Sequence, residues 1–299
     1  MKIKIISILL LIILGAGLVL TGCGENGNSA VTTTSTVINS TSGTTRETTI
    51  KQDEEVIVTF ACPELERLVR TELKIASEPI TSTDMLELYS IRPNGERVSS
   101  LSGLEYAVNL TDFGILRNEI ELESLDPISQ LTSLTRILVS YTTVSKAVVL
   151  GNLEQVTYLS FIDTNISDIS SLANLQAIQE LTLSDCGISD IGALAGMADL
   201  TRVNLYGNSI TSLDALQGKS KIESLNIQGN QVSDISPLAD MTSLQMATLS
   251  YNPITNLKPL EDLPNLQELT IYQDHDVKHL IFDQVAILEG KGIEVLYHR

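Results

Sequence analysis

Residues 219–240 read KSKIESLNIQGNQVSDISPLAD. Leu225 and Ile227 alternate with polar residues, which is the period of a short strand with one buried face. Asn230 follows at the turn out of the strand, where its amide can bond backbone groups that the bend leaves unpaired. The tail VSDISPL closes the coil on the opposite side. The segment therefore predicts one turn of a coil that begins with a strand.

The same 22-residue pattern recurs along much of the chain. Its form is L-x-x-L-x-x-L-x-L-x-x-N-x-I-x-D-I-x-x-L-x-x, and its positions are numbered 1 to 22 below. The pattern is clear over 153–262 and weaker at 131–152. It holds at 107–130 with two extra residues between Glu121 and Ser124. We count seven full repeats and one truncated repeat within 107–274.

A single repeat is too small to be stable alone. It buries about seven apolar side chains, each worth roughly 1.5–3 kcal/mol. Ordering its backbone costs roughly 1–2 kcal/mol for each of about 22 residues. The repeats must therefore stack, so the sequence predicts an elongated solenoid with one shared core.

Phrases such as VSDISPLAD (232–240) and ISDISSLAN (166–174) resemble the bacterial internalin-like leucine-rich repeat. The resemblance implies an α/β repeat fold, a curved leucine-rich-repeat solenoid with a parallel sheet on its concave face, used for protein recognition. It extends upstream, where FACPELERLVRTEL (60–73) and ITSTDMLEL (80–88) resemble the helical N-terminal cap of that family. Pro63 suits a first helical turn, and Thr81 with Asp84 approximates a capping box.

The resulting domain prediction has five parts. A lipoprotein signal peptide covers 1–22, and a lipidated cysteine with a disordered tether covers 23–52. A helical N-terminal cap covers 53–106, the repeats cover 107–274, and a C-terminal cap covers 275–299. In the last part a helix over 277–288 should stop near Gly290 and Gly292, and IEVLY should form a closing strand.

The N-terminus predicts a lipid anchor. Lys2 and Lys4 precede an apolar run from Ile5 to Leu20, which is short for a membrane span and typical of a secretory signal. The following LTGC resembles the bacterial lipobox, which implies that Cys23 becomes the lipidated first residue of the mature protein. An ordinary signal peptide or an uncleaved anchor is the alternative. The Ser/Thr-rich residues 24–52 can hardly form a core, and a flexible chain of that length would reach about 30 Å.

The charge balance restricts the partners. The chain carries a net charge of −18 and has a sequence pI near 4.5. A nucleic-acid partner requires a basic face, so this class is excluded, and electrostatic docking to anionic lipid is disfavoured.

Positions 7 and 9 of each strand should point inward, so positions 6, 8 and 10 should line the concave face, with position 11 at its rim. These positions carry aromatic, basic and apolar side chains that suit a protein interface. Solitary exposed apolar residues are also ordinary on protein surfaces. The predicted partner-binding residues are Arg136, Leu138, Tyr141, Tyr158, Ile162, Arg202, Tyr206, Met246, Tyr251 and Tyr272.

Other reactive side chains give weaker indications. Asp163 and Asp185, with Glu180 near, could bind a cation or act as an acid–base pair, although a solvated acidic rim is the simpler interpretation. His275 and His279, flanked by Asp274 and Asp276, have a spacing that can hold a metal but lack a third ligand. Cys62 and Cys186 should be buried free thiols, because three or more coils separate them.

The sequence therefore favours a non-enzymatic protein, without cofactor or metal, that is lipid-anchored in a bacterial cell envelope and exposed on its outer side. Its concave face should bind a protein partner, as an adhesin or receptor does. The alternative is binding of a glycan or cell-wall polymer along the same groove. A hydrolase that uses Asp163, Asp185 and Glu180 is a third hypothesis.

Overall fold

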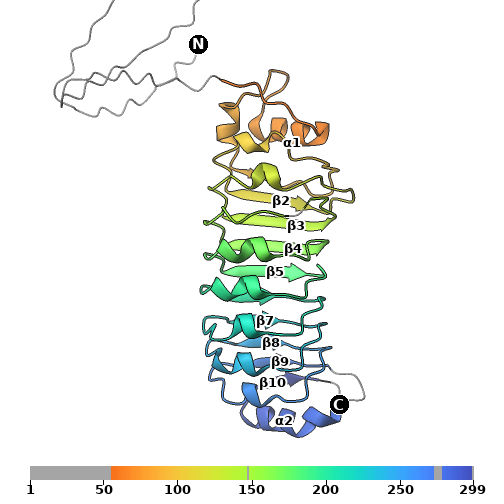
Figure 1. The fold of residues 1–299 in the computed structure, drawn as a ribbon, viewed down its shortest axis with the longest axis vertical. Helices are drawn as coiled ribbons and strands as arrows, with labels where there is room; N and C mark the ends of the chain where they lie inside the picture. Colours follow the sequence, from red (N-terminus) through yellow and green to blue (C-terminus); the bar gives the residue numbers. More distant parts are fainter. Residues whose placement is uncertain (1–54, 147, 273–277, 298–299) are drawn as a thin grey trace, which may run out of the picture. The chain divides into compact units, whose positions relative to one another are not determined.

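The computed structural model describes residues 55–146, 148–272 and 278–297. From Glu55 onward the chain forms one compact unit, in which ten parallel strands make a single sheet in chain order (Figure 1). The strands are β1 (Ser90–Ile91), β2 (Asp112–Leu116), β3 (Arg136–Thr142), β4 (Tyr158–Thr164), β5 (Glu180–Ser184), β6 (Arg202–Asn204), β7 (Ser224–Asn226), β8 (Met246–Thr248), β9 (Glu268–Thr270) and β10 (Glu294–Leu296).

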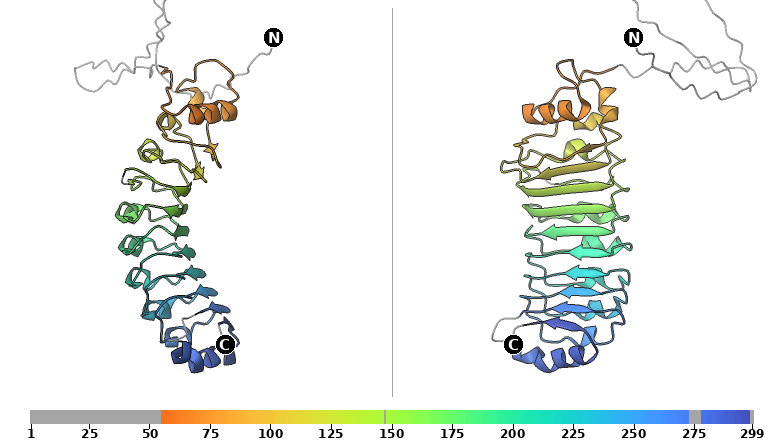
Figure 2. Two further views of the ribbon diagram at one scale, coloured as in Figure 1. Left: turned by 90° about the vertical axis from the view of Figure 1, so that its right-hand side faces the viewer. Right: turned by 180° about the vertical axis from the view of Figure 1, so that it is seen from behind.

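Figure 2 shows this unit from the side: the strands line the concave face, and short helices lie on the convex face. The α-helices are α1 (Pro63–Leu73) and α2 (Lys278–Gly290). The short 3₁₀ helices are Asp84–Glu87, Leu104–Tyr106, Asp126–Ile128, Ser170–Asn174, Gly192–Gly196, Asp214–Leu216, Ser236–Asp240 and Lys258–Leu260. The leucine-rich-repeat solenoid is thus the fold of the described residues.

No helix among these residues has both the length and the apolar character that crossing a bilayer requires.

The core follows the repeat pattern. Strands pair so that equal repeat positions lie side by side, for example Leu181 with Val203 and Val203 with Leu225. The side chains at positions 7 and 9 are buried in every strand from β2 to β9. Lys219 takes a position that is leucine or methionine in the neighbouring units. Its stem is buried and its Nζ donates to the carbonyl oxygens of Ala195 (3.1 Å) and Met197 (2.9 Å). Burial lowers the pKa of this amine.

The aspartate at position 16 starts the convex turn. The Oδ1 atoms of Asp168 and Asp234 accept hydrogen bonds from the backbone N–H groups two residues later, at 2.9 and 2.8 Å. These bonds stabilise the charged carboxylate and lower the pKa of both aspartates. The aspartate at position 16 therefore stabilises the turn locally, because its carboxylate accepts a hydrogen bond from a backbone N–H group that would otherwise be unpaired.

Asparagines at position 12 tie adjacent coils together. The Asn230 Nδ2 donates to the carbonyl oxygens of Leu205 and Ile227, both at 2.9 Å, and its Oδ1 accepts from the N–H of Ile210 at 3.0 Å. Asn208 and Asn252 bond their neighbours in the same way. All three side chains are buried. The predicted inward asparagine is therefore confirmed as a bridge between successive coils.

Cys186 occupies this position in one coil. It is buried and free, and its Sγ lies 3.2 Å from the carbonyl oxygen of Ser184 and 3.5 Å from that of Phe161. Burial raises the pKa of this thiol. Cys62 is also buried and free, as predicted.

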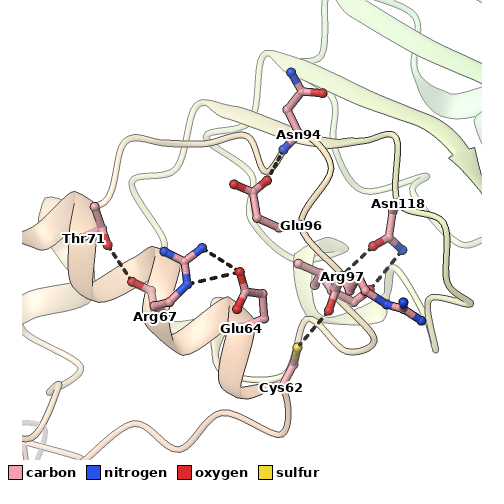
Figure 3. Close-up of polar contacts among 9 residues, drawn as sticks. Cys62, Glu64, Arg67, Thr71, Asn94, Glu96, Arg97 and Asn118 are labelled. Carbon is pink, nitrogen blue, oxygen red and sulfur yellow. Dashed lines mark hydrogen bonds and ion pairs between the residues drawn. The ribbon is translucent and has the colours of Figure 1, made fainter.

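At the N-terminal end, α1 begins at Pro63, and the Thr81–Asp84 pair makes reciprocal bonds. Figure 3 shows how this end meets the repeats: the Cys62 Sγ donates to the carbonyl oxygen of Arg97 at 3.9 Å. The Asn118 Oδ1 accepts from the N–H of Val98 at 2.8 Å, and its Nδ2 donates to the carbonyl oxygen of Val98 at 3.1 Å. The position-12 bridge therefore reaches into the region predicted to be a cap.

The structure differs from a purely helical cap, because residues 85–106 follow the plan of a repeat. β1 pairs with β2, and Gly95 has a positive φ of 93° at position 11. Apolar side chains are buried at the expected positions: Met85, Leu88, Ile91, Val98, Leu101 and Leu104. One further coil therefore precedes the repeats read from the sequence.

At the C-terminal end, the helix and strand form close to the predicted residues. α2 covers 278–290, Gly292 has a φ of 87°, and β10 pairs with β9. Ile281, Val285 and Leu288 of α2 are buried in the same core as the repeats. The predicted signal peptide and tether, together with Cys23, lie outside the described residues.

Candidate functional site

The candidate site is the concave face, defined as positions 6 and 8 of β2–β9. Register places Asp112, Arg136, Tyr158, Glu180 and Arg202 in one row across five neighbouring strands. Position 8 forms a second row, which from β4 onward is wholly hydroxyl or amide: Ser160, Thr182, Asn204, Asn226, Thr248 and Thr270. A shallow depression of about 380 Å³ follows these two rows over β4–β9.

Position 10 departs from the predicted outward orientation. Leu116, Ile162 and Tyr206 are at least partly exposed, but the serines at this position are buried: Ser140, Ser184 and Ser250. The Ser250 Oγ accepts from the N–H of Tyr272 at 2.9 Å, so this small hydroxyl serves the turn rather than the surface. The row at position 10 is therefore a mixture of surface and packing residues.

The ten predicted binding residues lie on this face, at position 10 next to it, and at its rim. Met246 and Arg202 are exposed in the position-6 row, and Arg136, Leu138 and Tyr158 are half-buried on β3 and β4. Ile162, Tyr206 and Tyr272 lie at position 10. Tyr141 and Tyr251 lie at position 11, each 52% exposed. The ten residues thus lie on the same side of the sheet, and their role in binding a partner remains a prediction.

Charges in the position-6 row are mostly paired within the face. Arg92, just after β1, pairs with Asp112, and the Arg202 Nη1 lies 2.6 Å from the Glu180 Oε1. Arg136 instead stacks on Tyr158, with its Cζ 3.5 Å from the ring centroid. Sequence analysis missed Arg92, because it follows a strand that the repeat pattern did not reveal.

Position 11 adopts the left-handed backbone conformation in seven successive repeats. The φ angles are 52° at Arg117, 53° at Tyr141, 51° at Asp163, 53° at Asp185, 69° at Gly207, 70° at Gly229 and 55° at Tyr251. A residue with a side chain pays about 1–2 kcal/mol in this conformation. Bulky tyrosines there are unusual, which favours a functional reason for Tyr141 and Tyr251. Glycine in two adjacent repeats was the available sequence signal.

The acidic residues do not form a three-carboxylate site. Asp163 and Asp185 sit on the rim, and burial, followed by the charge of Asp163, raises the pKa of Asp185. Glu180 is not near them, because it begins β5 while Asp185 follows its end, about 16 Å away at roughly 3.3 Å per residue. Glu180 is also neutralised by Arg202. Nothing in this geometry favours the hydrolase hypothesis.

Among the described residues, no three His, Cys, Asp or Glu side chains are grouped in a way that could hold a metal ion. The predicted histidine pair is not tested, since His275, Asp274 and Asp276 fall within 273–277, outside the described residues.

Comparisons with known proteins agree with this architecture. Residues 198–240 match the family model described as leucine rich repeats in two copies. An internalin, InlF, from Listeria monocytogenes has a crystal structure similar to this chain, with a TM-score of 0.71 and 26% sequence identity; the match covers 79% of this chain and 68% of that chain. Internalin C2 from the same species is similar in fold, with a TM-score of 0.58 and 24% identity over 80% of this chain and 94% of that chain. No curated protein matches.

The stacked coils, the parallel sheet and the matched repeats define a leucine-rich-repeat protein. More narrowly, the chain is similar in its leucine-rich-repeat architecture to the internalins.

Proposed function

We propose that this chain is a recognition protein of a bacterial cell envelope, anchored by lipid at Cys23 and binding a protein partner through its concave face. An internalin-like leucine-rich-repeat fold indicates protein recognition in general. The specific surface is inferred from one observation. Positions 7 and 9 are buried in every coil of the face, whereas the residues at positions 6 and 8, apart from the buried Gly114 and Ser160, are at least partly exposed to solvent.

The composition of this face supports a protein partner. It carries aromatic, arginine and apolar side chains, which are enriched at the energetic centres of protein interfaces. Met246 is 48% exposed on it. Eight strands at about 4.8 Å spacing give a surface roughly 34 Å long, enough for a standard interface. The polar position-8 row leaves a glycan as the alternative occupant.

Nothing in the described residues calls for catalysis. The acidic rim lacks a nearby third carboxylate, and the two described cysteines are buried. The anchor proposal depends on LTGC and the apolar run before it. Two or more acyl chains are needed for stable membrane attachment, since one binds at only about 10⁴ M⁻¹.

Replacing three tyrosines of the face and rim tests the function. In Tyr141→Asn/Tyr206→Ser/Tyr251→Asn, asparagine tolerates the left-handed conformation at 141 and 251, so we expect the fold to persist. Affinity for a protein partner captured by crosslinking to the full chain should fall about a hundredfold, because each tyrosine is a candidate hot spot.

The matched control is Tyr89→Ser. Tyr89 is 54% exposed and precedes β1, at the other end of the strands from the rim. It should leave capture unchanged. Equal capture by the triple variant and the wild type, or retention of polysaccharide alone, would refute recognition of a protein through this face.

A further inference from the structure

Arg136 differs from Arg202 on the concave face and from Arg92 beside it. Arg92 is paired with Asp112, and Arg202 is paired with Glu180. Register places Asp112 directly beside Arg136, yet that carboxylate bonds Arg92. Within the described residues Arg136 has no ion pair, and its Nε is buried without a hydrogen-bond acceptor. A guanidinium with this environment lacks an anionic partner.

Apart from Asp112, the neighbours of Arg136 on this face include an aromatic ring and apolar side chains. Its Cζ lies over the Tyr158 ring, and Leu138 is two residues further along β3 on the same face. Leu116 and Ile162 add partly exposed apolar surface on the two adjacent strands. Stacking on an aromatic ring fixes the guanidinium and reduces the conformational entropy it would lose on binding.

We propose that this patch, Arg136 with Tyr158 and Leu138, binds an acidic side chain of the protein partner within an extended apolar segment. The proposal rests on the proposed function and specifies the partner's chemistry. A guanidinium presents a planar fork that matches a carboxylate, and such bonds strengthen where water is excluded.

The geometry also sets a spacing. Arg136 and Leu138 are two residues apart on one strand, or about 7 Å. An extended segment places residues i and i+2 at the same separation. The partner should therefore carry Asp or Glu two positions from Leu, Ile, Val or Phe. The chain's net charge of −18 would repel a uniformly acidic partner, which favours a single acid in an apolar context.

The test is selection of a random-peptide phage library on the purified full chain, on Arg136→Gln and on Arg67→Gln. Peptides bound by the wild type should be enriched in an acidic residue two positions from an apolar one. Arg136→Gln should lose this enrichment. Arg67→Gln is the matched control, because it removes an exposed arginine of α1 that pairs with Glu64 and lies outside the concave face, and it should retain the enrichment.

The affinity of one selected peptide is then measured in a double-mutant cycle. Replacing its acid by the amide should weaken binding to the wild type about tenfold to a hundredfold and should leave binding to Arg136→Gln unchanged. Arg136→Lys keeps the charge but not the fork, so we expect it to bind at an intermediate level. Circular dichroism and thermal melting establish that each variant is folded.

Selection of basic peptides, absence of acidic enrichment, or equal effects of the two glutamine variants would overturn the proposal. If bound peptides depend on the rim tyrosines but not on Arg136, only this inference fails. If they depend on neither, the proposed recognition face fails as well.

Discussion

Replacing Asn230 with alanine should lower the free energy of unfolding by about 4 kcal/mol, because the change leaves buried backbone groups without partners, each costing about 1–3 kcal/mol. The Asn230 side chain is only 7% exposed, and it satisfies the carbonyl oxygens of Leu205 and Ile227 and the N–H of Ile210. Urea denaturation followed by circular dichroism measures the loss.

Asn226→Ala is the matched control in the same coil. Asn226 is half-buried on the concave face, and its Oδ1 accepts one bond from the N–H of Gln228 at 3.0 Å. Water can replace that bond, so the expected loss is below about 1 kcal/mol. Similar losses in the two variants would show that the position-12 asparagines do not hold the coils together.

Replacing Cys23 with serine should abolish lipidation completely. The thiol is the proposed acceptor of the diacylglycerol, and a hydroxyl at this position cannot form the thioether. Cells grown with an alkynyl fatty acid should label the wild-type chain and not the variant. Intact mass should place the N-terminus of the wild type at Cys23, whereas the variant should keep residues 1–22.

Cys186→Ala serves as the control for this experiment, because Cys186 is a buried internal thiol. Its labelling should match that of the wild type. A Cys23→Ser chain that still carries label, or a wild-type chain that never does, would rule out the lipid anchor.

The periodic part of the fold is predictable from the sequence because it repeats. Alternating pairs such as Leu225 and Ile227 predict strands, and Asn230 predicts the inward bridge, in successive coils that support one another. Local rules predict the start of α1 at Pro63 and the Thr81–Asp84 pair. That Cys62 and Cys186 are free thiols follows from the distance between the coils that carry them.

Features that depend on side-chain contacts between coils, or on repeat positions where the residue type varies, are not predictable from the repeat pattern. Residues 85–106 hide their coil because Pro93 stands where the pattern has leucine at position 9, and Glu96 stands where it has asparagine at position 12. The left-handed conformation at position 11 is occupied by Arg, Tyr, Asp and Gly, so composition gives little signal. Asp112 lies between two arginines, and only the structure shows that it pairs with Arg92 and leaves Arg136 without a carboxylate.

Recognition through the concave face is tested most directly by photo-crosslinking from a single coil. Thr182 lies on the face within β5, and Ser189 is exposed outside the strand in the same coil, residues 175–196. Benzoylphenylalanine at either position of the full chain reports which side touches a partner on irradiated cells. We expect a protein adduct from position 182 and none from position 189. Adducts from 189 alone, or none to protein from 182, would contradict the account.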